Sequence, residues 1–233
     1  MLNTSRRFAL LCLAVTVVLQ LQSIPTTAAE DVSQYYARTW QADDGLPRST
    51  ITSIAQTDDG YLWLGTPFGV IRFDGVTFTP ISELAGWNLG RLRARVLYAD
   101  AGDRLWIGSG TDGIGRWSAS HGSTVIKHDN GLPHPTINAM CEEQQMKLWI
   151  ATGDGQVSWV NADGKVHPAG LVLGRPSAVS IQLLRDRTGA MWFAQGSAYG
   201  QLVDGVATNV MHADDPVVLC ASRQGGLWFM SGT

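Results

Sequence analysis

A short apolar segment built around tryptophan recurs along the chain. In each copy the tryptophan stands between two apolar residues, and the five tryptophans are Trp63, Trp106, Trp149, Trp192 and Trp228. The first four are spaced 43 residues apart and the last interval is 36. Because self-similarity at a fixed period of this length is typical of repeat architectures, each copy predicts one structural unit.

Each unit is predicted to contain four short strands. A large apolar residue lies nine positions before every tryptophan, with mixed neighbours that follow the period of two of a strand; these residues are Ile54, Leu97, Met140, Leu183 and Leu219. A polar turn leads into the tryptophan strand. A glycine then opens a third strand, as in Gly69–Phe73, and an Asp-Gly turn leads to a fourth, as in 76–78.

A four-stranded unit of about 40 to 50 residues is the size of a propeller blade. A single blade cannot bury both faces of its sheet, so neighbouring blades must stack. The sequence therefore predicts an all-β fold, a β-propeller of four-stranded blades with about five blades present and the last incomplete. We interpret the repeated tryptophan as packing between blades. A sugar-stacking platform is the alternative, but it would not need the same residue in every blade.

The first 29 residues are predicted to be a signal peptide, which leaves 30–233 as the propeller region. Arg6 and Arg7 precede an uncharged apolar run, and Thr27, Ala28 and Ala29 supply the small residues of a cleavage site. An uncleaved membrane anchor is the alternative, but the run is shorter than the roughly 20 residues of a spanning helix. We therefore expect the chain to be exported.

Two cysteines, Cys141 and Cys220, follow the signal peptide. Each lies eight residues before a tryptophan, in blades three and five, with blade four between them. A disulfide needs Cα atoms within about 7 Å, so we expect two free and mostly buried thiols.

Residues 35–40 precede the first Gly-Leu-Pro segment in the manner of an outermost fourth strand, without the three strands that would come before it. The sequence stops after the second strand of blade five. We therefore expect a fragment of a longer protein, since propellers commonly close by pairing the N-terminal strand with the last blade.

Composition agrees with a globular chain of many short strands. Hydrophobic residues make up 45% of the 233 residues and charged ones 16%, with 26 glycines and nine tryptophans. The formal net charge of −3 supplies no basic field for nucleic acid, so we expect no nucleic-acid partner.

The segment from Trp40 to Gly75 resembles the two-component regulator propeller family. The resemblance rests on the Asp-Gly-Leu-Pro segment at 44–47, on Tyr61-Leu62-Trp63-Leu64-Gly65-Thr66 and on Arg72-Phe73-Asp74-Gly75. A second Gly-Leu-Pro stands at 131–133. The resemblance implies the periplasmic sensor region of a hybrid histidine kinase or related receptor. Membrane tethering, a downstream signalling domain in the full-length protein and a homodimer are further expectations.

Catalytic motifs are missing from the sequence. It contains no Gly-x-Ser-x-Gly, phosphate loop or dinucleotide fingerprint, and its five histidines are scattered. We therefore expect no catalytic residues, metal or cofactor and no enzymatic activity of this chain, although the full-length protein could carry a histidine kinase or diguanylate cyclase domain.

Basic residues recur where the chain enters successive blades. The residue fifteen positions before the tryptophan is Arg48, Arg91 or His134 in the first three blades. In an up-and-down blade this entering loop shares a face with the loop between strands two and three. Arg93 and Arg95 alternate with Leu92 and Ala94, so an extended segment keeps them on the side of Arg91.

These side chains, with Trp87 as a stacking surface, predict a site for an anionic or carbohydrate ligand. Solvated loop charges are the alternative. The leading function is thus a periplasmic ligand-sensing module of a two-component type receptor. A secreted lyase or hydrolase acting on polysaccharide and a passive interaction scaffold stay open, because the fold supports all three.

Overall fold

The structure, a computed structural model, describes residues 37–46, 50–85, 89, 92–143, 147–173, 181–222 and 226–232. It divides into two units, Met1–Trp40 and Gln41–Thr233. The predicted signal peptide, residues 1–29, lies outside the described residues. In the first unit, residues 37–40 have no regular structure. The predicted strand is therefore wrong for these residues: a strand needs a paired neighbour, and the described part of this unit supplies none.

The described residues of the second unit form five antiparallel sheets. The first contains β1 (Ser53–Gln56), β2 (Leu62–Thr66), β3 (Gly69–Phe73) and β4 (Phe78–Pro80), followed by the short helix α2 (Ile81–Ala85). The second contains β5 (Ala94–Ala99), β6 (Leu105–Ser109), β7 (Ile114–Ser118) and β8 (Gly122–Ile126). The third contains β9 (Ile137–Glu143), β10 (Lys147–Thr152), β11 (Gln156–Val160) and β12 (Val166–Val172).

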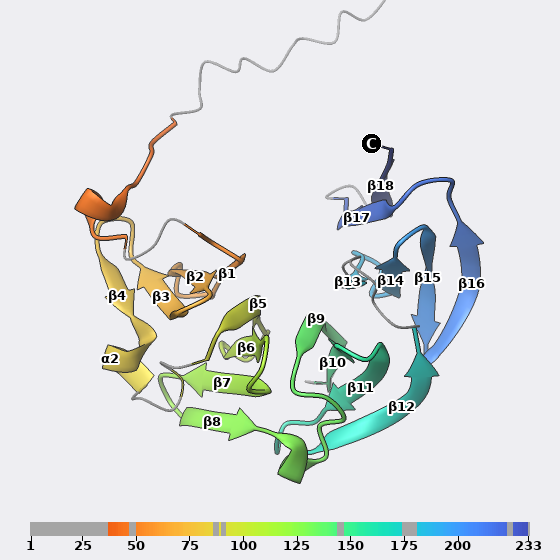
Figure 1. The fold of residues 1–233 in the computed structure, drawn as a ribbon, viewed down its shortest axis with the longest axis horizontal. Coiled ribbons are helices and arrows are strands. Elements are labelled where there is room, and N and C mark those ends of the chain that lie inside the picture. Colours follow the sequence, from red (N-terminus) through yellow and green to blue (C-terminus); the bar gives the residue numbers. More distant parts are fainter. Residues whose placement is uncertain are drawn as a thin grey trace, which may run out of the picture. The chain divides into compact units, whose positions relative to one another are not determined.

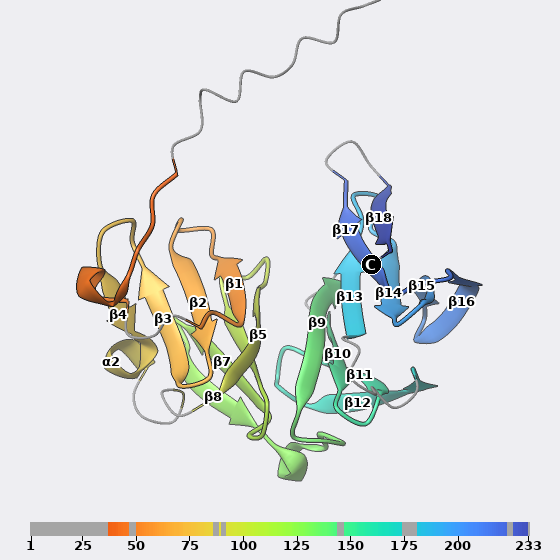
Figure 2. The ribbon, with the colours of Figure 1, turned by 45° about the horizontal axis from the view of Figure 1, so that its top comes forward.

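The fourth sheet contains β13 (Ile181–Arg185), β14 (Met191–Gln195), β15 (Ala198–Val203) and β16 (Val206–His212). The fifth contains β17 (Val217–Ala221) and β18 (Leu227–Ser231). Within each sheet the strands pair in sequence order, and the first strands of successive sheets lie next to one another (Figures 1 and 2). The predicted all-β propeller of four-stranded blades, with the last incomplete, is confirmed.

Tight turns between strands follow from their sequences. β15 and β16 are joined by Asp204 and Gly205, whose φ angles are 50° and 80°. Two consecutive left-handed residues make the hairpin turn whose twist matches the flanking strands, and Asp-Gly is a favoured pair for it. The Asp-Gly turn expected here is thus present.

Apolar cores lie between successive blades rather than within one. In blades two to five, the residue nine positions before the tryptophan belongs to a core that also contains residues of the preceding blade. Leu97 packs in a cluster with Trp63, and Met140 in one with Trp106. Leu183 packs with Trp149, and Leu219 with Ala194. Blades two, three and four therefore each contribute to two different cores.

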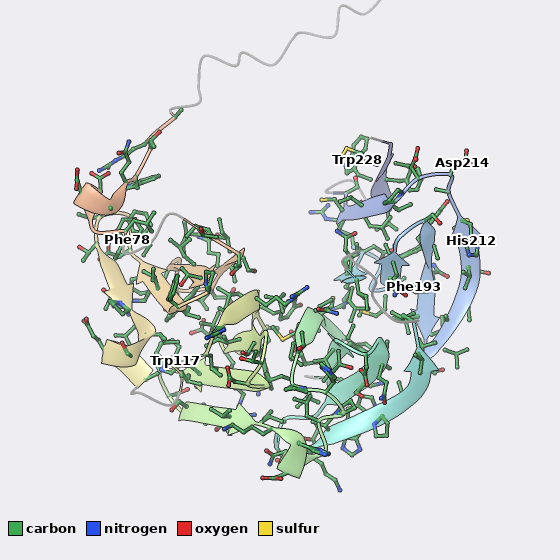
Figure 3. The ribbon with its side chains drawn as sticks, in the orientation of Figure 1. Phe78, Trp117, Phe193, His212, Asp214 and Trp228 are labelled. Carbon is green, nitrogen blue, oxygen red and sulfur yellow. The ribbon has the colours of Figure 1, made fainter. Side chains whose placement is uncertain are left out.

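The two ends of this succession depart from the expected burial. Ile54 is 62% exposed, because no described blade precedes β1 to cover it. Trp228, labelled on the last sheet in Figure 3, is 69% exposed, because no described strand follows β18. Burial at these two positions, expected from the repeat, is wrong for the described residues.

The indole nitrogens of four tryptophans are held by a residue six positions earlier. Trp63 donates to Thr57 Oγ1 at 2.9 Å and Trp106 to Asp100 Oδ2 at 2.6 Å. Trp149 donates to Glu143 Oε2 at 2.8 Å and Trp192 to Asp186 Oδ2 at 2.9 Å. Because a buried indole N–H needs an acceptor, this position fixes the ring within the blade.

The two cysteines differ. Both are free, and Cys141 is buried, as expected. Cys220 is exposed, contrary to the prediction, because β17 belongs to the two-stranded last sheet, where less packs around it. Burial raises the pKa of the Cys141 thiol to about 12, so this side chain is a neutral, apolar part of the core.

Candidate functional site

The entering segments and the loops after the second strands lie on one face of the second unit. In blade two, Gly110 N donates to Arg93 O at 3.1 Å, and in blade three Gly153 N donates to Thr136 O at 2.8 Å. Each bond ties the loop after the second strand to the segment that enters the same blade. We call this face the entering face.

Three of the six predicted site residues, Arg48, Trp87 and Arg91, lie outside the described residues. Of the other three, Arg93 directly precedes β5, and Arg95 is the second residue of that strand. Both are exposed, while Leu92 and Ala94 are buried, so the predicted alternation is present. A bulge at Arg95 lets Ala94 pair with Ser109 and Val96 with Gly108. Among the described residues, neither guanidinium group has an ion-pair partner.

His134 is held within its own blade. Its Nδ1 accepts a hydrogen bond from Thr136 N at 3.1 Å. A Cβ atom added at Gly153 would lie 2.8 Å from the ring, so the imidazole packs directly on the glycine backbone. With Nδ1 as the acceptor, a neutral His134 carries its proton on Nε2. The ring is half-buried, and its contacts with Thr136 and Gly153 hold it in place. Nε2 is then its hydrogen-bond donor.

A pocket of about 220 Å³ lies on the entering face between blades two and three. Sequence reasoning missed it. Its wall in blade two is the loop after β6, and its wall in blade three is the entering segment; the lining residues are Thr111, Asp112, Gly113, Lys127, His128, Leu132 and Pro135. The exposed Lys127 and His128 add two basic side chains to the face, and Asp112 adds one carboxylate.

The pocket floor is fixed by bonds between the two blades. Gly113 N donates to Pro135 O at 2.9 Å, and Thr136 Oγ1 donates to Gly110 O at 2.7 Å. Gly113 has φ of 87°, and a Cβ atom there would meet Ile126 O. Only glycine fits this position, so the sequence specifies the backbone here.

The Gly-Leu-Pro segment builds one wall of the pocket. It begins with the 3-10 turn η3 (His128–Asn130), in which Lys127 N donates to Asn130 Oδ1 at 3.0 Å and Gly131 takes φ of 90°. Leu132 then anchors the segment in the core. Blade one repeats this arrangement in η2 (Ala42–Asp44), where Gln41 N donates to Asp44 Oδ2 at 2.7 Å. The motif was the one available signal for the pocket.

Other chemistry is sparse among the described residues. In that part of the chain no group of three or more His, Cys, Asp and Glu side chains could hold a metal ion. The helices that can be described there are all too short and polar to cross a membrane. Burial raises the pKa of Tyr98 to about 12, so its hydroxyl stays protonated.

The sequence model of the family described as Two component regulator propeller matches residues 45–68. The match runs from the glycine of the first Gly-Leu-Pro segment through β1 and β2. Residues 45–68 are therefore similar to a two component regulator propeller repeat. The predicted resemblance is thus confirmed for this segment.

Solved structures share the fold at low identity. The extracellular domain of the hybrid two component system BT3049 from B. thetaiotaomicron aligns with a TM-score of 0.66 and 19% identity, covering 84% of this chain and 28% of that one. The corresponding domain of BT4673 from the same organism gives 0.61 and 15%, covering 84% and 27%.

Virginiamycin B lyase from Staphylococcus aureus aligns with a TM-score of 0.62 and 16% identity, covering 78% of this chain and 63% of the lyase. This chain therefore spans less than two thirds of each of these structures. A search of curated protein sequences gave no match. At these identities the likeness shows the propeller fold alone.

Proposed function

We propose that this chain is a periplasmic ligand-sensing module of a two-component type signalling receptor. The family match at 45–68 and the propeller fold support the signalling role. The single observation that carries ligand sensing is the pocket on the entering face, with basic side chains exposed around it. In this proposal the chain is exported, and the full-length protein tethers it to the membrane and carries the output domain.

The ligand class follows from the charges on the entering face. Arg93 and Arg95 on blade two and Lys127 on blade three are exposed cations, and Asp112 is the carboxylate of the pocket. Guanidinium groups offer planar, multidentate donors to carboxylates, sulfates and hydroxyl pairs. We therefore expect an anionic carbohydrate, which would span the face from the arginines to the pocket and bias the packing of blades two and three.

Binding of acidic oligosaccharides to the purified chain tests the proposal. Isothermal titration with oligomers of polygalacturonate and alginate should show saturable binding, whereas an uncharged glucan oligomer should not bind. The double variant Arg93→Ala/Arg95→Ala should weaken binding by about tenfold or more, because each charge-assisted hydrogen bond contributes about 1.5–3 kcal/mol.

Arg187→Ala is the matched control. Arg187 is also an exposed arginine, but it lies in the loop between β13 and β14, on the face opposite the entering segments. It should leave the affinity unchanged. Equal affinity of the double variant and the unmodified chain, or no binding of any acidic oligomer, would count against ligand sensing at this face.

A further inference from the structure

A second pocket, of about 250 Å³, lies on the face opposite the entering face. Its lining residues are Gly102, Arg104, Arg116, Ser118, His121, Gly122 and Ala162. They come from the loop between β5 and β6, from the β7–β8 hairpin, and from the loop between β11 and β12. The pocket therefore lies between blades two and three but is separate from the site of the proposed function.

The repeat shows what is unusual about this pocket. In the first three blades, the residue two positions before the tryptophan lies near the residue paired with the tryptophan on the third strand. In blade one these are Tyr61 and Arg72, and the guanidinium carbon lies 4.3 Å from the tyrosine ring centroid. In blade three they are Lys147 and Trp159, with Nζ 5.1 Å from the indole centroid. Both blades thus pair one cation with one aromatic ring.

Blade two has two arginines at these positions. Arg104 precedes β6, and Arg116 is the cross-strand partner of Trp106. The two guanidinium carbons lie 5.9 and 5.5 Å from the centroid of the same Trp106 ring. Where the neighbouring blades place an aromatic side chain, blade two has a second positive charge and an open pocket.

Among the described residues, a carboxylate pairs with Arg104 but none pairs with Arg116. Arg104 Nε donates to Asp100 Oδ2 at 2.6 Å in a buried ion pair. Arg116 Nη1 donates to the backbone oxygen of Ala162 at 2.5 Å. Within the described ranges no carboxylate lies at ion-pair distance from Arg116.

The electrostatics of Arg116 agree with an unfilled requirement for negative charge. Burial, and then the charge of Arg104, lower the pKa of Arg116, while Asp100 and Asp163 act in the opposite direction more weakly. His121 lines the same pocket, and its Nδ1 lies 2.7 Å from Ser120 Oγ. A buried or half-buried cation without a carboxylate partner is costly unless another anion compensates it.

We propose that this pocket binds a small oxyanion, a phosphate or carboxylate group, between the guanidinium groups of Arg104 and Arg116. A planar guanidinium can donate two parallel hydrogen bonds to such a group. The bond to Ala162 uses Nη1 of Arg116 and leaves its other donors for the anion, and the exposed His121 also lines the pocket. A free anion and an anionic group on a larger metabolite present the same chemistry here.

Titration of the purified chain with inorganic phosphate, at ionic strength held constant with sodium chloride, tests the site. Saturable binding is expected, with a Tm that rises with the logarithm of phosphate concentration above Kd. Arg116→Gln should weaken phosphate binding by about tenfold or more. Arg72→Gln, the same change at the equivalent position of blade one, is the matched control and should leave Kd unchanged. Absence of saturable binding, or equal Kd for all three proteins, would overturn the proposal.

Amide chemical shifts of the unmodified chain provide a test that does not depend on the stability of a variant. Phosphate should shift the amide signals of Gly102, Gly122 and Ala162 in a saturable way. Acetate that competes for the same signals would identify carboxylate as a ligand, and acetate without effect would restrict the site to phosphate-like anions. Shifts confined to the entering face would assign phosphate to the other site and overturn this one.

Discussion

Trp106 and Trp228 occupy the same strand position in blades two and five, yet their surroundings differ completely. The Trp106 side chain is 1% exposed and its nitrogen is bonded to Asp100, whereas Trp228 is largely in solvent. Their own strands do not explain this contrast, since both stand between two apolar residues on the second strand of a sheet. The difference comes from the next blade.

Trp106 is covered by β9, the first strand of blade three. Ile137 and Met140 of that strand share its core, and Gly108, two residues after Trp106, lets β9 approach. The same position is Gly65, Ala151 or Ala194 in the other blades that have a described successor, but Met230 in blade five. A blade of this protein therefore encodes half a core, together with the space for its neighbour to complete it.

Removing the two tryptophans should give the largest difference. Trp106→Ala should lower the free energy of unfolding by about 3–5 kcal/mol, because a large cavity opens between blades two and three. Trp228→Ala should change it by no more than about 0.5 kcal/mol, as at other exposed sites. Urea unfolding followed by circular dichroism measures both. Similar losses in the two variants would show that Trp228 is covered in solution.

The acceptor of the indole should be the next largest effect. Asp100→Ala removes the partner of both Trp106 and the buried Arg104, and breaking a buried ion pair costs about 3 kcal/mol or more. Glu143→Ala is the matched control, because Glu143 makes the same pair of contacts to Trp149 and Lys147 while about a third exposed. We expect about 1 kcal/mol there, since exposed pairs contribute little. Equal losses in unfolding experiments would contradict the role of burial.

Filling the space left by glycine should have a smaller effect. A Cβ atom at Gly108 would lie 2.6 Å from Val96 and 2.8 Å from Ile137, so Gly108→Ala should cost about 1–3 kcal/mol through overpacking between blades. Gly110→Ala is the control two residues later, where a Cβ atom meets nothing within 4 Å. Thermal unfolding of the two variants should therefore differ clearly. An unchanged Tm for Gly108→Ala would mean that β9 can move away freely.

The same contrast explains how far the sequence predicts the fold. The spacing of the tryptophans predicted four-stranded blades, because strand pairing within a blade is encoded locally by alternation and turns. It could not predict that Ile54 is exposed while Leu97 is buried, because that depends on a neighbour outside the repeat unit.

The candidate sites divide in the same way. The alternation that exposes Arg93 and Arg95 is a local property and could be predicted. The pocket at Lys127 is lined by residues of two blades, and the second pocket brings together Arg104 and Arg116 from different segments of blade two. Local sequence patterns do not encode either arrangement. The pair Arg104 and Arg116 could have been found by comparing the residue two positions before each tryptophan with the residue opposite the tryptophan on the third strand. Among the described blades, blade two alone has arginine at both positions.

The hydrogen bond to the indole also distinguishes blades by its response to pH. Asp186 holds Trp192 in blade four, whereas the equivalent residue of blade five is Ser222, which does not titrate in this range. Burial alone would raise the pKa of Asp186. Hydrogen bonds from Thr188, the Trp192 indole and Ala190 outweigh burial and lower the pKa below its ordinary value of 3.8.

A carboxyl group with a lowered pKa in the folded state stabilises the fold above its unfolded pKa and loses this contribution as pH falls through the folded value. The stability difference between the unmodified chain and Asp186→Asn should therefore be constant at neutral pH and shrink as the pH falls below 3.8. Urea unfolding in steps from pH 7 to about pH 3 measures this difference. Thr188→Ala, which removes the hydroxyl that donates to Asp186 at 2.6 Å, should retain part of the effect. If the stabilities of the unmodified chain and Asp186→Asn fall in parallel, the ionised Asp186 does not stabilise blade four, and its link to Trp192 is only geometric.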